Sequence, residues 1–450
     1  MSMTSYGEPP GHVAPDSLGG RRDDADETNE ANAALYRKLT RRILPFLFLA
    51  FVVAYIDRVN VSFAKLQMLA DLHLSETVYG IGAGIFFLGY FIFEVPSNLI
   101  LDRVGARRWI ARIMVTWAIV SCATMFAQDA TSFYMLRFLL GVAEAGFFPG
   151  VILYLTYWYP AHRRGRMTTF FMTAVALSGV IGGPISGFIL KAFDGVSGWH
   201  GWQWLFLLEG IPSVLAGVLV FFTLDERIAK ATWLTDEEKA LLARNVDAEE
   251  ATKEDLPLGA VMSSPRVWLM ALIYFSFVMG LYGVGFWLPT IIKATGVTDT
   301  FMIGLLSAIP YAAAVVAMIL IARSADKRRE RRWHLAIPAA IGAVGLVLSV
   351  IWAHQTALAM LGLTLATIGI LTTLPLFWSL PTAFLGGTAA AAGIAMINSI
   401  GNLAGFLSPY LMGWLKQVTG TNDAGMYMLA GFLVLGGLLA LSVPKRLVDK

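Results

Sequence analysis

The stretch Ile43-Leu-Pro-Phe-Leu-Phe-Leu-Ala-Phe-Val-Val-Ala-Tyr-Ile-Asp-Arg-Val-Asn-Val-Ser-Phe-Ala-Lys-Leu-Gln-Met68 is long and almost entirely apolar. A helix of roughly 20 apolar residues crosses the hydrocarbon core of a bilayer, which is about 30 Å thick. Lipid offers no partner to free backbone groups, so the crossing segment has to be helical. The stretch follows a polar N-terminal region, and we therefore interpret it as a membrane anchor and not as a cleaved secretory leader.

Comparable apolar segments recur along the whole chain. The chain has 450 residues, of which 57% are hydrophobic and only 14% are charged, a composition too apolar for a soluble fold of this length. The sequence predicts an all-α multi-pass membrane protein with twelve transmembrane helices. Their ranges are 43–68, 77–101, 109–127, 131–157, 167–192, 203–224, 267–292, 299–322, 333–353, 356–380, 388–416 and 424–443.

The second half of the chain repeats the first. The interval between the starts of the first and seventh segments also separates Asp102 from Asp326, each in a basic loop after the second helix of its half. Such duplication predicts two six-helix bundles around a central cavity. We expect a disordered tail at 1–42, bundles at 43–224 and 267–443, and a tail at 444–450. The linker at 225–266 carries the capping-box pattern Thr235-Asp-Glu-Glu238, which predicts a short surface helix.

Basic residues mark the cytoplasmic side of a membrane protein. They gather in alternate loops, which places both termini in the cytoplasm. A formal net charge of +3 gives no signal for nucleic acid. The single cysteine and the scattered histidines offer no metal-ligand spacing, so we expect neither a metal nor a cofactor.

One of these basic loops has a composition that favours a role in conformational gating. It reads Asp102-Arg-Val-Gly-Ala-Arg-Arg108 and combines one carboxylate and one glycine with several cations. We predict that it clamps helix ends in one conformation and releases them in another. The alternative is that it only sets membrane topology. The predicted gating residues are Asp102, Arg103, Gly105, Arg107, Arg108 and, in the repeat, Asp326.

This loop, echoed in the second half, looks like the signature of the major facilitator superfamily. Three further motifs resemble the anion:cation symporter branch, in particular its bacterial tartrate-transporter-like members. They are Ala54-Tyr-Ile-Asp-Arg-Val-Asn60, Phe93-Glu-Val-Pro-Ser-Asn98 and Arg137-Phe-Leu-Leu-Gly-Val-Ala-Glu144-Ala-Gly. The resemblance implies a bacterial inner-membrane location, and we expect a monomer.

Four charged residues lie deep within predicted helices: Asp57, Arg58, Arg137 and Glu144. A charge near the bilayer centre costs about 2.5 to 3.5 kcal/mol on the mildest scales, so each is a functional candidate. Burial and pairing shift a carboxylate's proton affinity, so we expect Asp57 and Glu144 to carry protons. A guanidinium matches an organic carboxylate, so we expect Arg58 and Arg137 to bind substrate. The alternative is that Asp57 with Arg58, or Arg137 with Glu144, form ion pairs that only join helices.

Neutral candidates complete the predicted binding site. In the first half they are Tyr55, Tyr90 and Asn60, and the resemblance places the two tyrosines on the family cavity. In the second half they are Trp378, Asn398 and Asn402, of which the two asparagines lie one turn apart on one helix face. We assign Glu209 a structural role, and Glu94 and Arg112 a place near the cytoplasmic clamp.

The leading hypothesis is proton-coupled import of a small organic anion, such as tartrate, another dicarboxylate or a sugar acid. Its partners would be this substrate, protons and the lipid bilayer. One alternative is an aromatic-acid carrier, and another is an exchanger or exporter, suggested by the glycine-rich run Gly179-Val-Ile-Gly-Gly-Pro-Ile-Ser-Gly187. A non-transporting membrane sensor or an enzyme would be a different class, but no nucleophile-base pair, nucleotide loop or large soluble domain supports it.

Overall fold

The computed structural model describes the backbone of residues 16–250, 263–384 and 387–445, and their side chains apart from those of 16–31, 161–169, 247–250 and 382–392. Every regular element in these ranges is a helix. The first half of the chain contains α1 (Asp16–Val59), α2 (Val61–Asp71), α3 (Glu76–Val104), α4 (Ala106–Ala123), α5 (Ala130–Glu144), α6 (Phe147–Thr156), α7 (Ala161–Ala192) and α8 (Gly201–Thr223), with short 3-10 turns between some of them.

The second half begins after the linker helix α9 (Asp236–Glu250). It contains α11 (Pro265–Ala294), α12 (Thr300–Arg328), α13 (Arg332–Ile351), α14 (Thr356–Phe377), α15 (Ser379–Phe384), α16 (Gly387–Thr419) and α17 (Asp423–Ser442). Within the described residues, 11 spans are long and apolar enough to cross a membrane. Helix α16 occupies the position of the remaining predicted segment, 388–416. The prediction of an all-α, twelve-helix membrane protein is confirmed.

The chain divides into two compact units, Met1–Pro45 and Phe46–Lys450. In the first unit the structure differs from the predicted tail at 1–42, because α1 already begins at Asp16. The part of this region from Asp16 to Arg42 contains four Ala and five Arg residues, which favour helix. An existing membrane helix also removes the cost of nucleating a new one. The low hydrophobicity that suggested disorder therefore does not exclude helix here.

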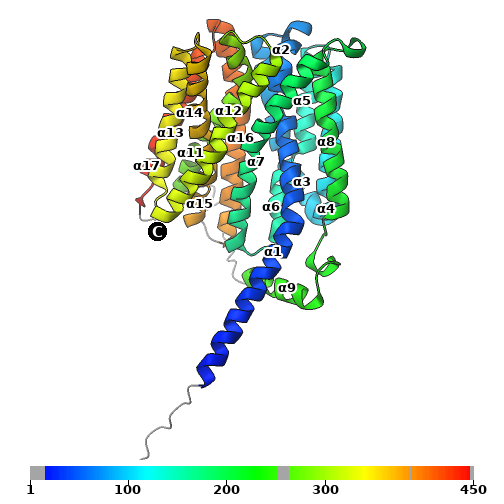
Figure 1. Cartoon of the computed structure of the whole chain (residues 1–450), viewed down its shortest axis with the longest axis vertical. Coiled ribbons are helices and arrows are strands. Elements are labelled where there is room, and N and C mark those ends of the chain that lie inside the picture. Colours follow the sequence, from blue (N-terminus) through cyan, green and yellow to red (C-terminus); the bar gives the residue numbers. More distant parts are fainter. Residues whose placement is uncertain (1–15, 251–262, 385–386, 446–450) are drawn as a thin grey trace, which may run out of the picture. The chain divides into compact units, whose positions relative to one another are not determined.

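Within the second unit the helices form two groups. We call α1 to α8 the N half and α11 to α17 the C half. In the N half α4 packs on α8 and α3 packs on α5, whereas in the C half α13 packs on α14 and α17. Figure 1 shows α4, α5 and α8 on one side and α13, α14 and α17 on the other. The two halves meet mainly where α7 packs on α12, α3 on α16 and α2 on α11.

The glycine-rich run of α7 lies at one of these contacts. A Cβ atom on Gly183 would come within 2.8 Å of the Gly304 carbonyl oxygen, and one on Gly187 within 2.4 Å of the Thr300 carbonyl oxygen. The glycines let the α7 and α12 backbones approach each other closely. The run that suggested an exchanger or exporter therefore has a packing role in this fold.

Three spans are interrupted at predicted site residues. Asn60 separates α1 from α2, Trp378 separates α14 from α15, and a break after Glu144 separates α5 from α6. The last break contains Gly146, whose φ of 84° is left-handed. A Cβ atom there would also lie 2.4 Å from the Ser97 hydroxyl, so only glycine fits without strain. Interrupted helices at membrane depth are typical of transporter binding sites.

A close approach of α13 and α14 gives a first test of the fold. A Cβ atom on Gly345 would lie 2.4 Å from the Ala366 backbone nitrogen and 2.6 Å from the Gly362 carbonyl oxygen, and neither backbone can move freely. Gly345→Ala is expected to destabilise the protein by about 1 to 3 kcal/mol and to lower its thermal midpoint in detergent. Gly431→Ala is the matched control, because nothing lies within 4 Å of that position. Equal midpoints for the two variants would contradict this packing.

The linker helix α9 starts where the capping box predicts. The Thr235 hydroxyl accepts a hydrogen bond from the Glu238 backbone nitrogen at 3.2 Å. The Glu238 carboxylate in return accepts one from the Thr235 backbone nitrogen at 2.9 Å. This reciprocal pair satisfies two backbone donors at the helix start.

Candidate anion and proton site

An ion pair between Arg58 and Glu144 lies at the centre of the predicted site. The Arg58 Nη2 atom donates to Glu144 Oε1, and their side chains are only 13% and 1% exposed. Arg58 comes from α1 and Glu144 from the end of α5, so the pair connects two helices of the N half. Arg58 Nη1 also donates to the Tyr282 hydroxyl of α11 at 3.2 Å, which extends the contact into the C half.

This pairing differs from both ion pairs considered as alternatives. The partner of Glu144 is Arg58, whereas the sequence suggested Arg137. Neighbours in a helix point in directions about 100° apart, so Asp57 and Arg58 face different surroundings. In the described residues Glu144 pairs with Arg58 and Asp57 accepts from Trp117, so the structure shows neither of the ion pairs that the sequence suggested.

Aromatic rings surround the Arg58 guanidinium. Its Cζ atom lies 5.8 Å from the Tyr55 ring centroid, 5.3 Å from that of Phe86 and 5.7 Å from that of Tyr90. At such distances a cation is attracted to the electron-rich face of a ring. The structure thus brings Tyr55 and Tyr90 to Arg58. These rings stabilise the cation without adding a negative charge that would repel an anion.

Asp57 occupies a separate polar pocket inside the N half. Its carboxylate accepts hydrogen bonds from Trp117 Nε1 at 3.0 Å, from the Ser121 hydroxyl at 3.1 Å and from the Ser213 hydroxyl. These donors belong to α4 and α8, and Asp57 is only 1% exposed. The three donors stabilise the charged form of this carboxylate, whereas its burial opposes that form. The two predicted proton carriers, Asp57 and Glu144, therefore have different surroundings.

Arg137 is buried against the backbone of α3. Its Nε atom donates to the Gly82 carbonyl at 3.3 Å and its Nη2 atom to the Ala83 carbonyl at 3.5 Å. The residue is fully buried, and its Cζ atom lies 5.3 Å from the Phe86 ring that also faces Arg58. Within the part of the chain that the structure describes, its Nη1 atom has no hydrogen-bond partner. The structure thus holds Arg137 by backbone carbonyls and leaves one donor for another group.

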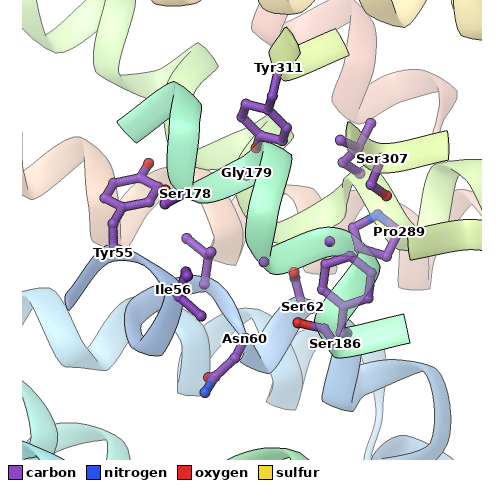
Figure 2. Close-up of a pocket in the computed structure, with 16 residues that line it drawn as sticks. Tyr55, Ile56, Asn60, Ser62, Ser178, Gly179, Ser186, Pro289, Ser307 and Tyr311 are labelled. Atoms are coloured by element: carbon purple, nitrogen blue, oxygen red, sulfur yellow. The ribbon is translucent and has the colours of Figure 1, made fainter. Parts of the chain in front are cut away.

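Asn60 lies beside a pocket between the two halves. The pocket is lined by residues of α1, α2, α7, α11 and α12, and Tyr55 of α1 is among them. Figure 2 shows Ser307 and Tyr311 across the pocket from Ile56, with the Asn60 amide pointing away from them. Both amide atoms of Asn60 are buried without a hydrogen-bond partner among the described residues.

The candidates of the C half fall into two places. Asn398 Nδ2 donates to Glu94 Oε1 at 3.4 Å, so it connects α16 to α3 across the two halves. Trp378 packs against Tyr274 with ring centroids 4.9 Å apart. Asn402 lies one turn beyond Asn398 and is half-buried. Glu94, which we assigned to the clamp, is thus in contact with a predicted substrate residue.

The predicted gating loop contacts the N half and the start of the linker. Asp102 accepts a hydrogen bond from the Tyr157 hydroxyl at 3.3 Å, and Arg108 pairs with Glu226 at 3.5 Å. Gly105 separates α3 from α4 with a φ of 98°. The hydrogen bond from Lys230 holds the pKa of Glu226 below its ordinary value, so this carboxylate stays charged beside Arg108 at neutral pH.

The remaining loop residues are less constrained. The Arg107 Cζ atom lies 5.1 Å from the Phe221 ring centroid, whereas Arg103 is exposed. In the repeat Asp326 pairs with Arg331 at 2.7 Å, within its own loop.

A charged cluster at the other end of the helices was not predicted from the sequence. Glu76 pairs with Lys65 of α2 at 2.7 Å and with Lys416 of α16 at 2.6 Å. The Lys65 Nζ atom also lies 3.1 Å from the Trp287 ring centroid of α11. The cluster joins both halves at the end opposite to the basic loops. The sequence feature that could have indicated this cluster is Lys65, because it is a charged residue within the apolar stretch 43–68.

Comparisons with known proteins place this chain in a family. The model of the Major Facilitator Superfamily matches residues 47–409. A protein of Agrobacterium vitis named "Putative tartrate transporter" is 50% identical over 419 residues, which cover 93% of this chain and 96% of that protein. A "Quinolone resistance transporter" of Acinetobacter baumannii is 42% identical over 415 residues, which cover 91% and 95% of the two chains.

Solved structures agree at the level of the fold. The crystal structure of a D-xylose-proton symporter superposes with a TM-score of 0.71 at 18% identity, covering 91% of this chain and 99% of that one. The chain belongs to the major facilitator superfamily. It is a multi-pass membrane transporter of a small molecule and not an enzyme.

Proposed function

We propose that this transporter carries a small organic anion, such as tartrate, another dicarboxylate or a sugar acid, together with protons. The observation that supports the proposal best is the buried Arg58–Glu144 ion pair, whose guanidinium also reaches Tyr282 in the C half. A buried guanidinium is a carboxylate-binding group, and here it is neutralised by a carboxylate that can accept a proton.

Proton binding and anion binding are linked through this pair. An ionised Glu144 holds Arg58 and competes with an incoming carboxylate. A protonated Glu144 carries no charge, so the Arg58 guanidinium is released for the substrate. The proton and the anion therefore favour each other's binding. A bound proton raises the protein's affinity for the anion, and a bound anion raises its affinity for the proton by the same factor.

The second requirement of a symporter is that both halves respond to the ligands. Arg58 and Glu144 belong to the N half, whereas Tyr282 belongs to the C half. A substrate anion that replaces Glu144 on Arg58 would alter this contact between the halves. Transporters of this architecture move one bundle against the other around a fixed site.

We take the direction of transport to be inward. We place the end that carries Arg103, Arg107 and Arg108 in the cytoplasm, because basic loops stay on that side. The cluster of Lys65, Glu76 and Lys416 then joins the two halves at the outer end. An inward proton gradient offsets the cost of importing an anion against the membrane potential, about 2.3 kcal/mol per charge at 100 mV.

Aromatic acids are a second candidate class of substrate. Phe377 stacks on Tyr274 with centroids 4.9 Å apart, and Trp378 lies at the same distance from Tyr274. Phe87 and Tyr282 add a further pair with centroids 4.4 Å apart, directly beside the partner of Arg58. Such rings could hold an aromatic ring by offset or edge contacts.

Uptake into proteoliposomes under an imposed pH gradient tests the proposed function. We expect inward-directed protons to accelerate uptake of tartrate or a sugar acid, because protonation of Glu144 releases Arg58. Acceleration by outward-directed protons would support an exporter, and no response to protons would contradict symport. A thermal-shift screen of organic acids, run first, selects the substrate, and an aromatic acid as the strongest stabiliser would favour the second class.

A further inference from the structure

A further buried carboxylate, Glu209, lies on α8 of the N half. The residue is 5% exposed and belongs to the middle of α8. Its Oε1 atom accepts a hydrogen bond from the Ser186 hydroxyl of α7 at 2.6 Å. Its Oε2 atom is buried without a hydrogen-bond partner among the residues that the structure describes. The proposed mechanism gives this side chain no role.

No described cation compensates this carboxylate. The titratable groups that face it are Asp57 of α1 and, beside Gly210, the Cys122 thiol of α4, and the neutral Asn60 amide lies next to it. Helices α2, α4 and α7 pack against α8, and Lys65 of α2 is bound to Glu76 instead. An isolated charge at such a position would cost several kcal/mol, so the group is most stable with a proton bound.

Glu209 is next to the pocket between the halves. Its hydrogen-bond donor Ser186 and its neighbour Asn60 both line that pocket. Figure 2 shows the Asn60 amide directed away from Ser307 and Tyr311, to the side opposite the C half. Among the described residues, neither the Asn60 amide atoms nor the Glu209 Oε2 atom has a hydrogen-bond partner, although Asn60 lies next to Glu209. These polar groups therefore lie between the pocket and the interior of the N half.

Glu209 is also one helical turn from Ser213, which is one of the hydrogen-bond donors to Asp57. Ser213 follows Glu209 by four residues on α8, and its hydroxyl donates to Asp57 Oδ2. Residues four apart lie on the same face with Cβ atoms about 5 to 6 Å apart. The two carboxylates differ in their hydrogen bonds, because Asp57 accepts three and Glu209 accepts one.

We propose that Glu209 is a proton-binding site on the route between this pocket and Asp57. The inference rests on the proposed proton coupling. A proton that enters from the pocket binds the Glu209 carboxylate and makes it neutral. When the proton leaves, the Ser213 hydroxyl accepts it and passes its own proton to Asp57, so Glu209 becomes charged and Asp57 neutral. The total charge of the pair does not change during this transfer.

Difference infrared spectroscopy during a pH titration detects proton binding to Glu209 directly and does not require a transport assay. We expect the wild type to show a protonated-carboxyl carbonyl band that Glu209→Gln removes. Ser186→Ala should keep the band and shift it to higher frequency, because the carbonyl loses its hydrogen bond. Glu237→Gln is the control, since Glu237 is an exposed residue of α9. A full set of bands in Glu209→Gln, or an unshifted band in Ser186→Ala, would overturn the proposal.

Transport measurements then separate this inference from the proposed function. In proteoliposomes Glu209→Gln is expected to slow proton-driven uptake roughly tenfold, which corresponds to about 1.4 kcal/mol in the barrier. Counterflow exchange, which needs no net proton movement, should stay at the wild-type rate. A wild type that ignores the proton gradient contradicts the proposed function, whereas a Glu209→Gln variant that responds as fully as the wild type contradicts this inference alone.

Discussion

Replacing Glu144 by Gln is expected to abolish proton-driven accumulation of the substrate while counterflow exchange continues. The Gln side chain keeps an oxygen that accepts from Arg58, so the contact between α1 and α5 is preserved. It carries no charge and cannot bind a proton, so it resembles the protonated state permanently. Arg58 is then always available to the anion, and substrate movement no longer depends on protons. Uptake under a pH gradient checks the loss of proton-driven accumulation. Counterflow exchange without a gradient, measured in the same vesicles, checks that substrate movement continues.

Glu237→Gln provides the matched control for this experiment. It makes the same chemical change on the exposed face of α9 and should leave both assays at wild-type values. A wild-type pH dependence of uptake in Glu144→Gln would remove Glu144 from the coupling. Loss of counterflow as well would show that Glu144 is needed to hold the site together, which is the role of a merely structural ion pair.

Replacing Arg58 by Lys is expected to raise the KM for the anion by roughly tenfold to a hundredfold. A lysine keeps the positive charge beside Glu144, so no buried carboxylate is left without a cation. It loses the planar fork that can hold a carboxylate and Tyr282 together. Hydrogen bonds to charged groups contribute about 1.5 to 3 kcal/mol each, which corresponds to this range. Both proton-driven uptake and counterflow should show the higher KM, which distinguishes this variant from Glu144→Gln.

Arg112→Lys serves as the control for the loss of a guanidinium. Arg112 stacks on Trp109 with its Cζ atom 3.7 Å from the ring centroid, a contact within α4. We expect an unchanged KM in this variant. An unchanged KM in Arg58→Lys would mean that the anion binds elsewhere, and Arg137 with its unpartnered Nη1 atom would be the next candidate.

The two halves of the predicted site differ in how far the structure supports them. Tyr55 and Tyr90 were expected on a cavity, and the structure brings both rings to Arg58. Asn398 and Trp378 were expected to face the substrate, and the structure gives them the partners Glu94 and Tyr274. The four charged candidates Asp57, Arg58, Arg137 and Glu144 all lie in the N half, whereas aromatic groups of both halves contribute to the site, so the duplication is architectural and the chemistry is unequal.

The sequence by itself determined the helices and the residues of interest. In lipid, an apolar segment of membrane length satisfies its backbone hydrogen bonds by forming a helix. The distribution of apolar residues was therefore sufficient to predict the transmembrane helices. Charges such as Asp57, Arg58 and Glu144 stand out for the same reason, because each opposes the apolar run around it.

Only the tertiary structure decided which of these residues act together. Arg58 contacts Glu144 and Tyr282, Asp57 accepts a hydrogen bond from Ser213, and no cation of the described residues faces Glu209. Each side chain's direction depends on the rotation of its helix and on neighbours that are distant in sequence. A stretch such as 43–68 fixes the order of its side chains along the helix. The stretch does not fix which neighbouring helices these side chains contact. Those contacts determine where a proton and an anion can bind.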